Sequence, residues 1–427
     1  MNGPADGLLK WRLQDGVRYG LLGFPLAFCA LPLYVLLPNL YAREFGIGLS
    51  TLGGILLGAR LFDAVIDPML GRWCDRLFGR SLDSVLGFGA GAALLLAVGF
   101  TLLFFPPARE PQALLWWASG LLVLTYAGFS ALSVAHQSWG AMLGGNEMVR
   151  SRIVAWREGL GLAGVVMASV LPALAGLGSM VALFVLSLLI GWMAWRTALR
   201  PAPQPAAVGA DDMWRPWREA AFRRLILVFS INGIASAVPA TLVLFFVQDR
   251  LQAPESIQPL FLGSYFVAAA LSMPLWLAAV KRFGLAESWL LGMALAIAVF
   301  FWAFQMGAGD AWPFVVVCVL SGVALGSDLA LPGALLAGVI GRANHRGIAE
   351  GAYFGWWNFT AKLNLALAAG VTLPLLHWFG YAPGARDTAA LEALSWTYCV
   401  MPCLLKAMAA LALYLLIIKP EQTKVAP

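Results

Sequence analysis

Apolar runs of roughly 20 residues recur along the whole chain, and they constrain its fold more than any other feature. The chain has 427 residues, of which 61% are hydrophobic and only 12% are charged. A run of about 20 apolar residues is long enough to cross the hydrocarbon core of a bilayer as one helix. Because backbone polar groups in lipid must be satisfied within the chain itself, these runs predict an all-helical, polytopic membrane protein.

Twelve such runs can be placed, six on each side of a polar stretch in the middle of the chain. They cover residues 17–42, 51–70, 85–105, 113–142, 153–175, 180–195, 225–246, 260–280, 289–307, 314–340, 351–378 and 394–418. The polar stretch, residues 200–224, is rich in Pro, Ala and charge, which is typical of a linker. The predicted domains are an N-terminal six-helix bundle (1–197), a cytoplasmic linker (198–224) and a C-terminal six-helix bundle (225–427).

The distribution of Lys and Arg predicts the orientation in the membrane. An even number of spans puts both termini on one side, and most of the Lys and Arg residues fall in the loops of that side. The opposite loops hold only Arg43, Arg109, Arg250 and Arg386. Because short cytoplasmic loops are enriched in Lys and Arg, both termini are predicted to be cytoplasmic, and a bacterial inner membrane is the expected location. The net charge of +6 follows from this asymmetry and predicts no nucleic-acid partner.

The second predicted span runs into the sequence ARLFDAVIDPMLGRWCDRLFGR, residues 59–80. It places Asp63 and Asp67 at membrane depth, at positions i and i+4 on one helix face. A charge at this depth costs at least about 2.5 kcal/mol, so an acidic pair there indicates a function. Either a cation lies between the carboxylates or they share a proton. The alternative is that Arg60 or Lys362 simply neutralises them.

The segment GRWCDRLFGR, which starts at Gly71, is of the G-x-x-x-D-R-x-G-R type, with two residues instead of one between Arg76 and Gly79. It resembles the signature of the major facilitator superfamily between the second and third helices, which implies a fold of two six-helix bundles. Asp75 can cap a helix N-terminus or meet arginines across the cytoplasmic seam. Gly71, Asp75, Arg76 and Arg80 are therefore predicted to form a cytoplasmic gate. A plain loop of solvated charges is the alternative.

The second span also resembles the glycoside, pentoside and hexuronide cation symporters, the melibiose-carrier family, whose pattern is close to R-x-x-D-A-x-x-D-P-x-x-G. Residues 347–371, GIAEGAYFGWWNFTAKLNLALAAGV, resemble the eleventh helix of that family. The resemblance implies a symporter that works by alternating access, with a small-molecule solute such as a sugar and a coupling cation as its partners. It also implies that Asp63, Asp67 and Lys362 couple the cation, and it implies no cofactor.

Two departures from the family pattern bear on the cation and on the solute. The family often has Asn where Ile66 stands, and the loss of that oxygen favours H⁺ over Na⁺, since Na⁺ prefers oxygen ligands. If Na⁺ is the cation, Asp63 and Asp67 would hold it. Sugar-transporting relatives also carry acids on the first and fourth helices, which this chain lacks. A sugar or glycoside therefore stays open beside an anionic solute bound through Arg157.

Polar and aromatic residues inside the spans are the candidates for the substrate cavity. They are Tyr126, Ser133, His136, Gln137, Arg157, Asn232, Asp328, Trp356 and Asn358. Each could instead serve packing, because polar side chains also hydrogen-bond between membrane helices. Lys406 in the last span is expected to snorkel toward the interface. The letters GLGLAG, residues 159–164, match a dinucleotide motif, but inside an apolar span they predict close helix packing.

Other classes of function have less support. No Walker loop, H-E-x-x-H or G-x-S-x-G motif is present, so an ATP-driven pump, a hydrolase or any other enzyme is not predicted. Three alternatives to a symporter stay open. They are a transporter of lysolipids or other amphiphiles, an exporter of the same fold, and a non-transporting membrane sensor or scaffold. A monomer is expected.

Overall fold

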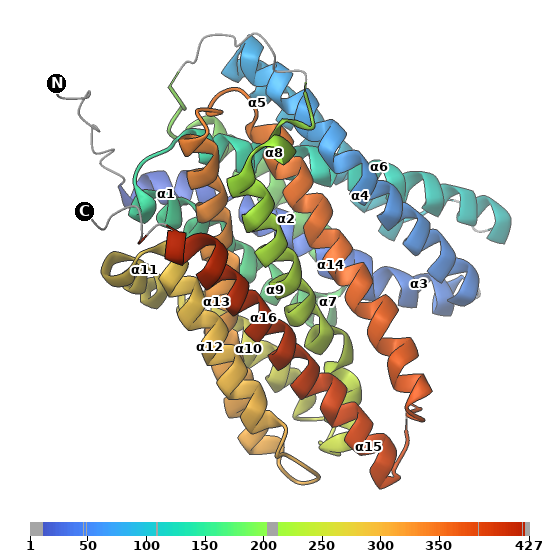
Figure 1. Ribbon diagram of the computed structural model, residues 1–427. Coiled ribbons are helices and arrows are strands. Elements are labelled where there is room, and N and C mark those ends of the chain that lie inside the picture. The colour runs from blue at the N-terminus through green and yellow to red at the C-terminus, as the bar shows by residue number, and fades with distance from the viewer. Residues whose placement is uncertain are drawn as a thin grey trace. The chain divides into compact units, whose positions relative to one another are not determined.

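The computed structural model describes residues 12–45, 47, 49–107, 110–202, 212–382, 384–420 and 422. The two termini, on which the predicted orientation depends, lie outside these residues. The described residues form helices and contain no strand (Figure 1). The prediction of an all-helical chain is therefore confirmed.

The helices before the linker follow the first six predicted spans. They are α1 (Leu13–Gly20), α2 (Gly23–Leu31), the π-helical turn η1 (Pro32–Leu36), α3 (Leu37–Glu44), α4 (Leu49–Arg80), α5 (Leu82–Phe104), α6 (Pro111–Met142) and α7 (Glu147–Arg196). Gly176 interrupts α7 with a φ of +81°, a conformation that glycine adopts without strain. The fifth and sixth predicted spans are thus the two arms of α7.

The helices after the linker follow the other six. They are α8 (Arg215–Arg218), α9 (Ala220–Phe245), η2 (Phe246–Arg250), α10 (Gln258–Leu271), α11 (Met273–Phe283), α12 (Leu285–Ala303), α13 (Ala311–Arg342), α14 (Glu350–Trp378), α15 (Thr388–Ser395), η3 (Trp396–Val400), α16 (Met401–Leu413) and η4 (Tyr414–Ile418). Short π-helical turns continue several helices without ending the span.

Within the described residues, nine helices are long and apolar enough to cross a membrane, and the bent pair α10–α11 makes a tenth. The two remaining predicted spans fall on less regular or more polar helices. The first is divided among α1, α2, η1 and α3, with prolines at its breaks. The second falls on α4, which carries Arg60, Asp63 and Asp67. Charge and interruption therefore set these two helices apart from the other ten.

The chain divides into two compact units. Unit 1 comprises residues 1–216 and 337–359, and unit 2 comprises residues 217–336 and 360–427. The end of α13 and the start of α14 thus belong to the same unit as the first six predicted spans. This grouping differs from the continuous C-terminal bundle of the sequence analysis, whose boundaries stay a prediction.

Close approach of α2 and α7 through small residues organises unit 1. A Cβ atom on Gly23 would lie 2.3 Å from the carbonyl oxygen of Arg157, and one on Gly164 would lie 2.2 Å from that of Phe24. Only glycine permits such backbone contact. The packing role predicted for residues 159–164 is therefore confirmed. Phe28, Phe100 and Phe184 fill the core beside this contact.

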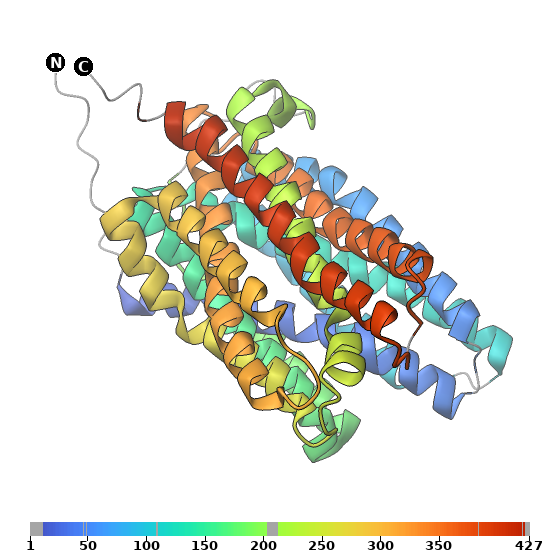
Figure 2. The same ribbon diagram turned by 60° about the horizontal axis from the view of Figure 1, so that its bottom comes forward.

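In unit 2, α16 packs against α9 and against α12, and it lies beside each of them in both views (Figures 1 and 2). Aromatic rings fill the core at one end of these helices. The rings of Phe246 and Tyr398 stack with centroids 4.2 Å apart, and Phe314 lies 5.6 Å from Phe246. Unit 2 thus has a core of its own.

Candidate functional site

The acidic pair of α4 lies in unit 1 and is withdrawn from solvent. Asp63 is 5% exposed and Asp67 is 0% exposed. Because α4 is continuous through this region, the two carboxylates share one side of the helix. Two buried acids in this arrangement favour a bound cation or a shared proton. The two carboxylates are therefore buried on one helix face, and their role in cation coupling stays a prediction.

Ser130 of α6 makes a direct contact with this pair. Its hydroxyl donates a hydrogen bond of 2.6 Å to Oδ1 of Asp63. Hydrogen bonds to a charged acceptor are shorter and stronger than neutral ones. Ser130 is a polar residue of the fourth predicted span that the cavity candidates do not include. It lies in register with Tyr126, Ser133 and Gln137 at helical spacing, and that periodicity could have identified it.

Arg60 brings a positive charge to the same region. It lies one turn before Asp63 on α4, and its guanidinium carbon is 6.0 Å from the centre of the Tyr126 ring on α6. This is the outer range of a cation–π contact. Arg60 therefore links α4 to α6 next to the acidic pair and reduces the net negative charge there.

Ser133 and Gln137 continue the polar face of α6. The side-chain amide of Gln137 donates a hydrogen bond of 3.0 Å to the Ser133 hydroxyl. Gln137 is half-buried and Ser133 is 9% exposed. The two side chains thus form a polar patch one to two turns beyond Ser130 along the helix. As neutral donors and acceptors they suit a hydroxylated solute, and their cavity role stays a prediction.

His136 is held inside the packing of unit 1. It is 0% exposed, its Nε2 atom lies 2.8 Å from the carbonyl oxygen of Tyr19, and the Tyr19 hydroxyl donates to the His136 carbonyl at 3.0 Å. The two rings stack with centroids 4.3 Å apart. These contacts join α1 to α6. Substrate contact by His136 stays a prediction, and it would require the Tyr19 contact to rearrange.

Arg157 forms an ion pair with its neighbour Glu158 on α7. Its Nε atom lies 3.0 Å from Oε1 of Glu158, and the two side chains are 16% and 24% exposed. The positive charge is thus balanced by the next residue. A balanced guanidinium attracts an anionic solute less than an isolated one does.

The first turns of α14 contact the linker through Trp356. The indole Nε1 of Trp356 donates to the Met213 carbonyl oxygen at 2.8 Å, and its ring lies 4.9 Å from that of Trp214. Asn358, two residues further along α14, is half-buried. Lys362 follows on α14 in unit 2. The predicted roles of Trp356 and Asn358 in the cavity, and of Lys362 in coupling, stay predictions.

Asp75 lies at the N-terminal end of α14. Its two carboxylate oxygens accept hydrogen bonds from the backbone N–H groups of Gly351 (2.6 Å) and Ala352 (2.8 Å). The first N–H groups of a helix lack partners within it and carry a partial positive charge, so a buried carboxylate suits this place. Asp75 is 4% exposed, whereas Arg76 and Arg80 are exposed. One of the two contacts considered for Asp75, a helix cap, is therefore present.

Glycines let α4 and α14 approach each other closely, beside Asp67 and along the turn of α4 that follows it. A Cβ atom on Gly71 would lie 2.0 Å from the Gly351 carbonyl oxygen, and the reverse distance is also 2.0 Å. One turn along, a Cβ atom on Gly355 would lie 2.6 Å from the carbonyl oxygen of Asp67. Gly351 and Gly355 form the small-x-x-x-small spacing of close membrane helices. The predicted gate residue Gly71 thus belongs to a tight helix crossing.

Unit 2 holds a separate buried polar cluster. The predicted cavity residues Asn232 and Asp328 lie together, and Lys406, Ser236 and Trp289 bond to them. The expectation that Lys406 snorkels is wrong, because this side chain is 5% exposed and bonds to Asp328. A buried acid on the neighbouring helix offered a better partner than the distant interface.

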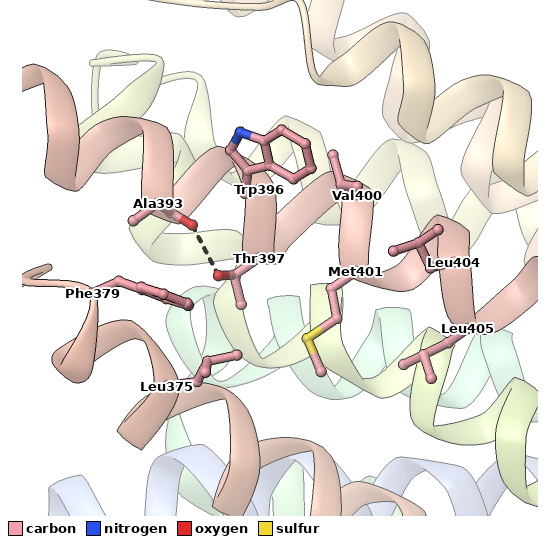
Figure 3. A pocket seen from close by; sticks show the side chains of 9 residues that line it. All are labelled: Leu375, Phe379, Ala393, Trp396, Thr397, Val400, Met401, Leu404 and Leu405. Carbon is pink, nitrogen blue, oxygen red and sulfur yellow. Dashed lines mark hydrogen bonds between the residues drawn. The ribbon is translucent and has the colours of Figure 1, made fainter.

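Two hollows of unit 2 lie apart from these groups. A groove of about 480 Å³ runs between α14 and the segment from α15 to α16, and apolar side chains line it apart from Thr397 (Figure 3). The Thr397 hydroxyl itself donates to the Ala393 carbonyl oxygen. Such a surface suits lipid chains better than a polar solute. A second, more polar hollow of about 510 Å³ includes Asp249 and Arg386.

Comparison with known proteins places the chain among transporters. Residues 17–419 match the family model described as MFS/sugar transport protein. YjmB of Bacillus subtilis (strain 168), named a symporter, is 23% identical over 401 residues, which cover 88% of this chain and 86% of that protein. YagG of Escherichia coli (strain K12), named a glycoside/cation symporter, is 24% identical over 152 residues, 36% of this chain and 33% of that protein.

A solved structure agrees on the fold. A bacterial homologue of the iron transporter ferroportin, in an outward-facing state, superimposes with a TM-score of 0.72 at 17% identity, and the match covers 95% of this chain and 99% of that one. Identity at this level shows the fold alone. The sequence resemblance to the cation symporters is confirmed by the family model, which spans nearly the whole chain. This multi-pass membrane protein therefore belongs to the MFS/sugar transport protein family of major facilitator transporters.

Proposed function

We propose that this protein is a cation-coupled symporter of a small polar solute, such as a sugar or glycoside, that works by alternating access. The observation that carries the proposal is the buried acidic pair of α4, Asp63 and Asp67, with the Ser130 hydroxyl bonded to Asp63. Ionisable side chains inside membrane-spanning helices are costly, and many of them mark ion or substrate pathways. The names of the relatives YjmB and YagG agree with this reading.

The coupling cation is H⁺ or Na⁺, bound at Asp63 and Asp67, with Lys362 as the competing positive charge. Ile66 removes one oxygen ligand from the family pattern, which favours H⁺. Ser130 offers another oxygen, because a hydroxyl that donates to Asp63 keeps its lone pairs for a cation. The number of oxygen ligands therefore does not decide between H⁺ and Na⁺, and an experiment is needed.

The solute is a neutral, hydroxylated molecule. Tyr126, Ser133 and Gln137 supply neutral hydrogen-bonding groups along α6, and Glu158 already balances the charge of Arg157. Neutral donors and acceptors suit the hydroxyl groups of a sugar, whereas an anion would require an uncompensated positive charge. Transport limited to anionic solutes would contradict this assignment.

The cytoplasmic gate is the contact between α4 and α14. Asp75 holds the first N–H groups of α14, and Gly71, Gly351 and Gly355 bring the two helices into backbone contact. Alternating access requires this contact to form in one state and break in another. The gate lies on the same two helices as Asp67 and Lys362, so cation binding can bias it directly. The protein acts in a bacterial inner membrane with cytoplasmic termini, as a monomer.

Thermal unfolding of the purified protein tests the cation site without a known solute. Wild type, Asp63→Asn and Asp67→Asn are compared in Na⁺, Li⁺ and choline and across pH, because a ligand at about 100 times its Kd stabilises by about 2.7 kcal/mol. Asp83→Asn is the matched control, since Asp83 is an exposed acid paired with Arg200. A Na⁺-dependent rise in Tm that both site variants lose indicates sodium coupling.

A pH dependence that both variants lose, without any Na⁺ effect, indicates proton coupling. Equal profiles for wild type and both variants would contradict the proposal. Reconstituted vesicles then provide the transport assay. Asp67→Asn should abolish gradient-driven accumulation of a glycoside while the protein still inserts, and the control Asp83→Asn should accumulate normally.

A further inference from the structure

A buried pair of opposite charges in unit 2 lies outside the proposed coupling trio. The ammonium Nζ of Lys406 on α16 lies 2.8 Å from Oδ2 of Asp328 on α13. The two side chains are 6% and 12% exposed. Both residues lie inside helices that are apolar enough to span the membrane. An ion pair at this depth calls for a functional explanation.

Neighbouring side chains surround the carboxylate of Asp328 with donors. Oδ1 accepts from Asn232 Nδ2 at 3.0 Å and from Trp289 Nε1 at 2.9 Å, and Oδ2 accepts from the Ser236 hydroxyl at 3.1 Å in addition to Lys406. Lys406 also donates to the Asn232 side-chain oxygen at 2.8 Å. Four donors on two oxygens stabilise the ionised carboxylate. They leave it little capacity to receive a solute hydroxyl.

The titratable groups near the pair are few among the described residues. Tyr265 of α10 lies within electrostatic range of Asp328, and Cys403 lies one turn before Lys406 on α16. Asn232, Ser236 and Trp289 carry no charge. Within the described part of unit 2, the ammonium of Lys406 is thus the charge in direct contact with this acid.

We propose that Lys406 is a charge-setting residue that keeps Asp328 as a proton-free carboxylate, so that cation binding is confined to Asp63 and Asp67. Asn232 and Asp328 then position α9, α12, α13 and α16 relative to one another instead of contacting solute. The part of this proposal that concerns coupling rests on the proposed function. The charge pair itself does not depend on it.

Removal of Lys406 alone should convert Asp328 into a proton-binding acid, in addition to the Asp63 and Asp67 pair. An uncompensated carboxylate at membrane depth is costly, and proton uptake removes that cost. The native state would then hold a proton that the unfolded chain releases above about pH 4. Because the native state binds more protons than the unfolded state, stability falls as pH rises.

The experiment compares purified wild type, Lys406→Met, Lys406→Arg and the double variant Asp328→Asn/Lys406→Met by thermal unfolding between about pH 5.5 and about pH 8.5. In Lys406→Met, Tm should fall relative to wild type by at least about 3 °C across this range. Lys406→Arg keeps the charge and the double variant removes both charges, so both should run parallel to wild type. A Lys406→Met profile parallel to wild type would overturn the proposal.

Two further measurements keep the result decisive. If neither Lys406→Met nor Lys406→Gln yields folded protein, recovery of the folded double variant supports charge pairing, and its loss overturns the proposal. The profiles are also repeated in an Asp63→Asn/Asp67→Asn background. In that background, the fall of Tm with rising pH that is specific to Lys406→Met should persist even if the α4 acids bind no cation. A failure of this proposal can therefore be told apart from a failure of the proposed function.

Discussion

At the residue scale, the hydrogen bond from Ser130 to Asp63 gives the sharpest prediction about the cation site. Ser130→Ala removes a 2.6 Å donor from a buried carboxylate, and a hydrogen bond to a charged group contributes about 1.5–3 kcal/mol. Because the same change removes the hydroxyl oxygen that is proposed to bind Na⁺, the apparent Na⁺ affinity, read from the dependence of Tm on Na⁺, should fall by about tenfold or more. If protons couple instead, the pH profile of Tm should be displaced.

Ser133→Ala provides the control for this prediction. Ser133 lies on the same helix face but bonds to Gln137 and not to an acid. Its removal should leave the cation response as in wild type. If the cation response of Tm is unchanged in Ser130→Ala, or if it changes equally in both variants, Ser130 does not belong to the cation site.

His136 gives a second prediction at this scale, in which packing outweighs substrate contact. The buried ring stacks on Tyr19 and bonds to its carbonyl oxygen. His136→Ala leaves a cavity and removes this bond, and large-to-small changes in a core typically cost about 2–5 kcal/mol. Tm should fall by several degrees with the cation response unchanged. A variant with normal Tm and weaker solute binding would instead support contact between His136 and the solute.

At the element scale, the crossing of α4 and α14 depends on glycine. A Cβ atom on Gly355 would lie 2.6 Å from the carbonyl oxygen of Asp67, so Gly355→Ala must push the helices apart. Overpacking of this kind typically costs about 1–3 kcal/mol. Tm should fall, and the response to cation should weaken because Asp67 moves with the backbone. Gly370→Ala is the control on the same helix.

A Cβ atom on Gly370 meets nothing within 4 Å. Alanine is the better helix former by about 0.5–1 kcal/mol, so this control should be neutral or slightly stabilised. If both glycine variants behave alike, helix propensity rather than the α4–α14 contact explains the result. The difference between the two variants therefore measures the contact.

The cap from Asp75 to α14 is the second prediction at this scale. Asp75→Ala removes both acceptors from the N–H groups of Gly351 and Ala352, and loss of a helix cap costs about 0.5–2 kcal/mol. Hydrogen exchange at these two amides, followed by mass spectrometry, should accelerate by roughly two- to thirtyfold. Asp83→Ala, at the exposed start of α5, should leave that exchange unchanged.

At the scale of the whole molecule, the sequence predicts the fold better than it predicts the partners of each side chain. Length and hydropathy locate ten of the twelve predicted spans as long apolar helices within the described residues, if the bent pair α10–α11 counts as one, because a bilayer fixes both properties. Helical spacing also pairs Asp63 with Asp67. Contacts between distant helices have no such local signal. The bonds of Asp75 to Gly351, of Ser130 to Asp63, and of Lys406 to Asp328 join residues far apart in sequence.

Symport itself gives the last prediction, because it belongs to no single residue or helix. If one cation and one solute cross together, each must raise the affinity for the other by the same factor, typically about fivefold to 150-fold. Titration of melibiose into the purified protein at low and saturating cation gives one factor. Titration of the cation without and with melibiose gives the other. The factors should be equal in wild type and equal to one in Asp67→Asn. If melibiose does not bind, the titrations use another glycoside that does. Glycoside binding that does not depend on Na⁺ or on pH would contradict symport and would favour a transporter that moves its solute alone.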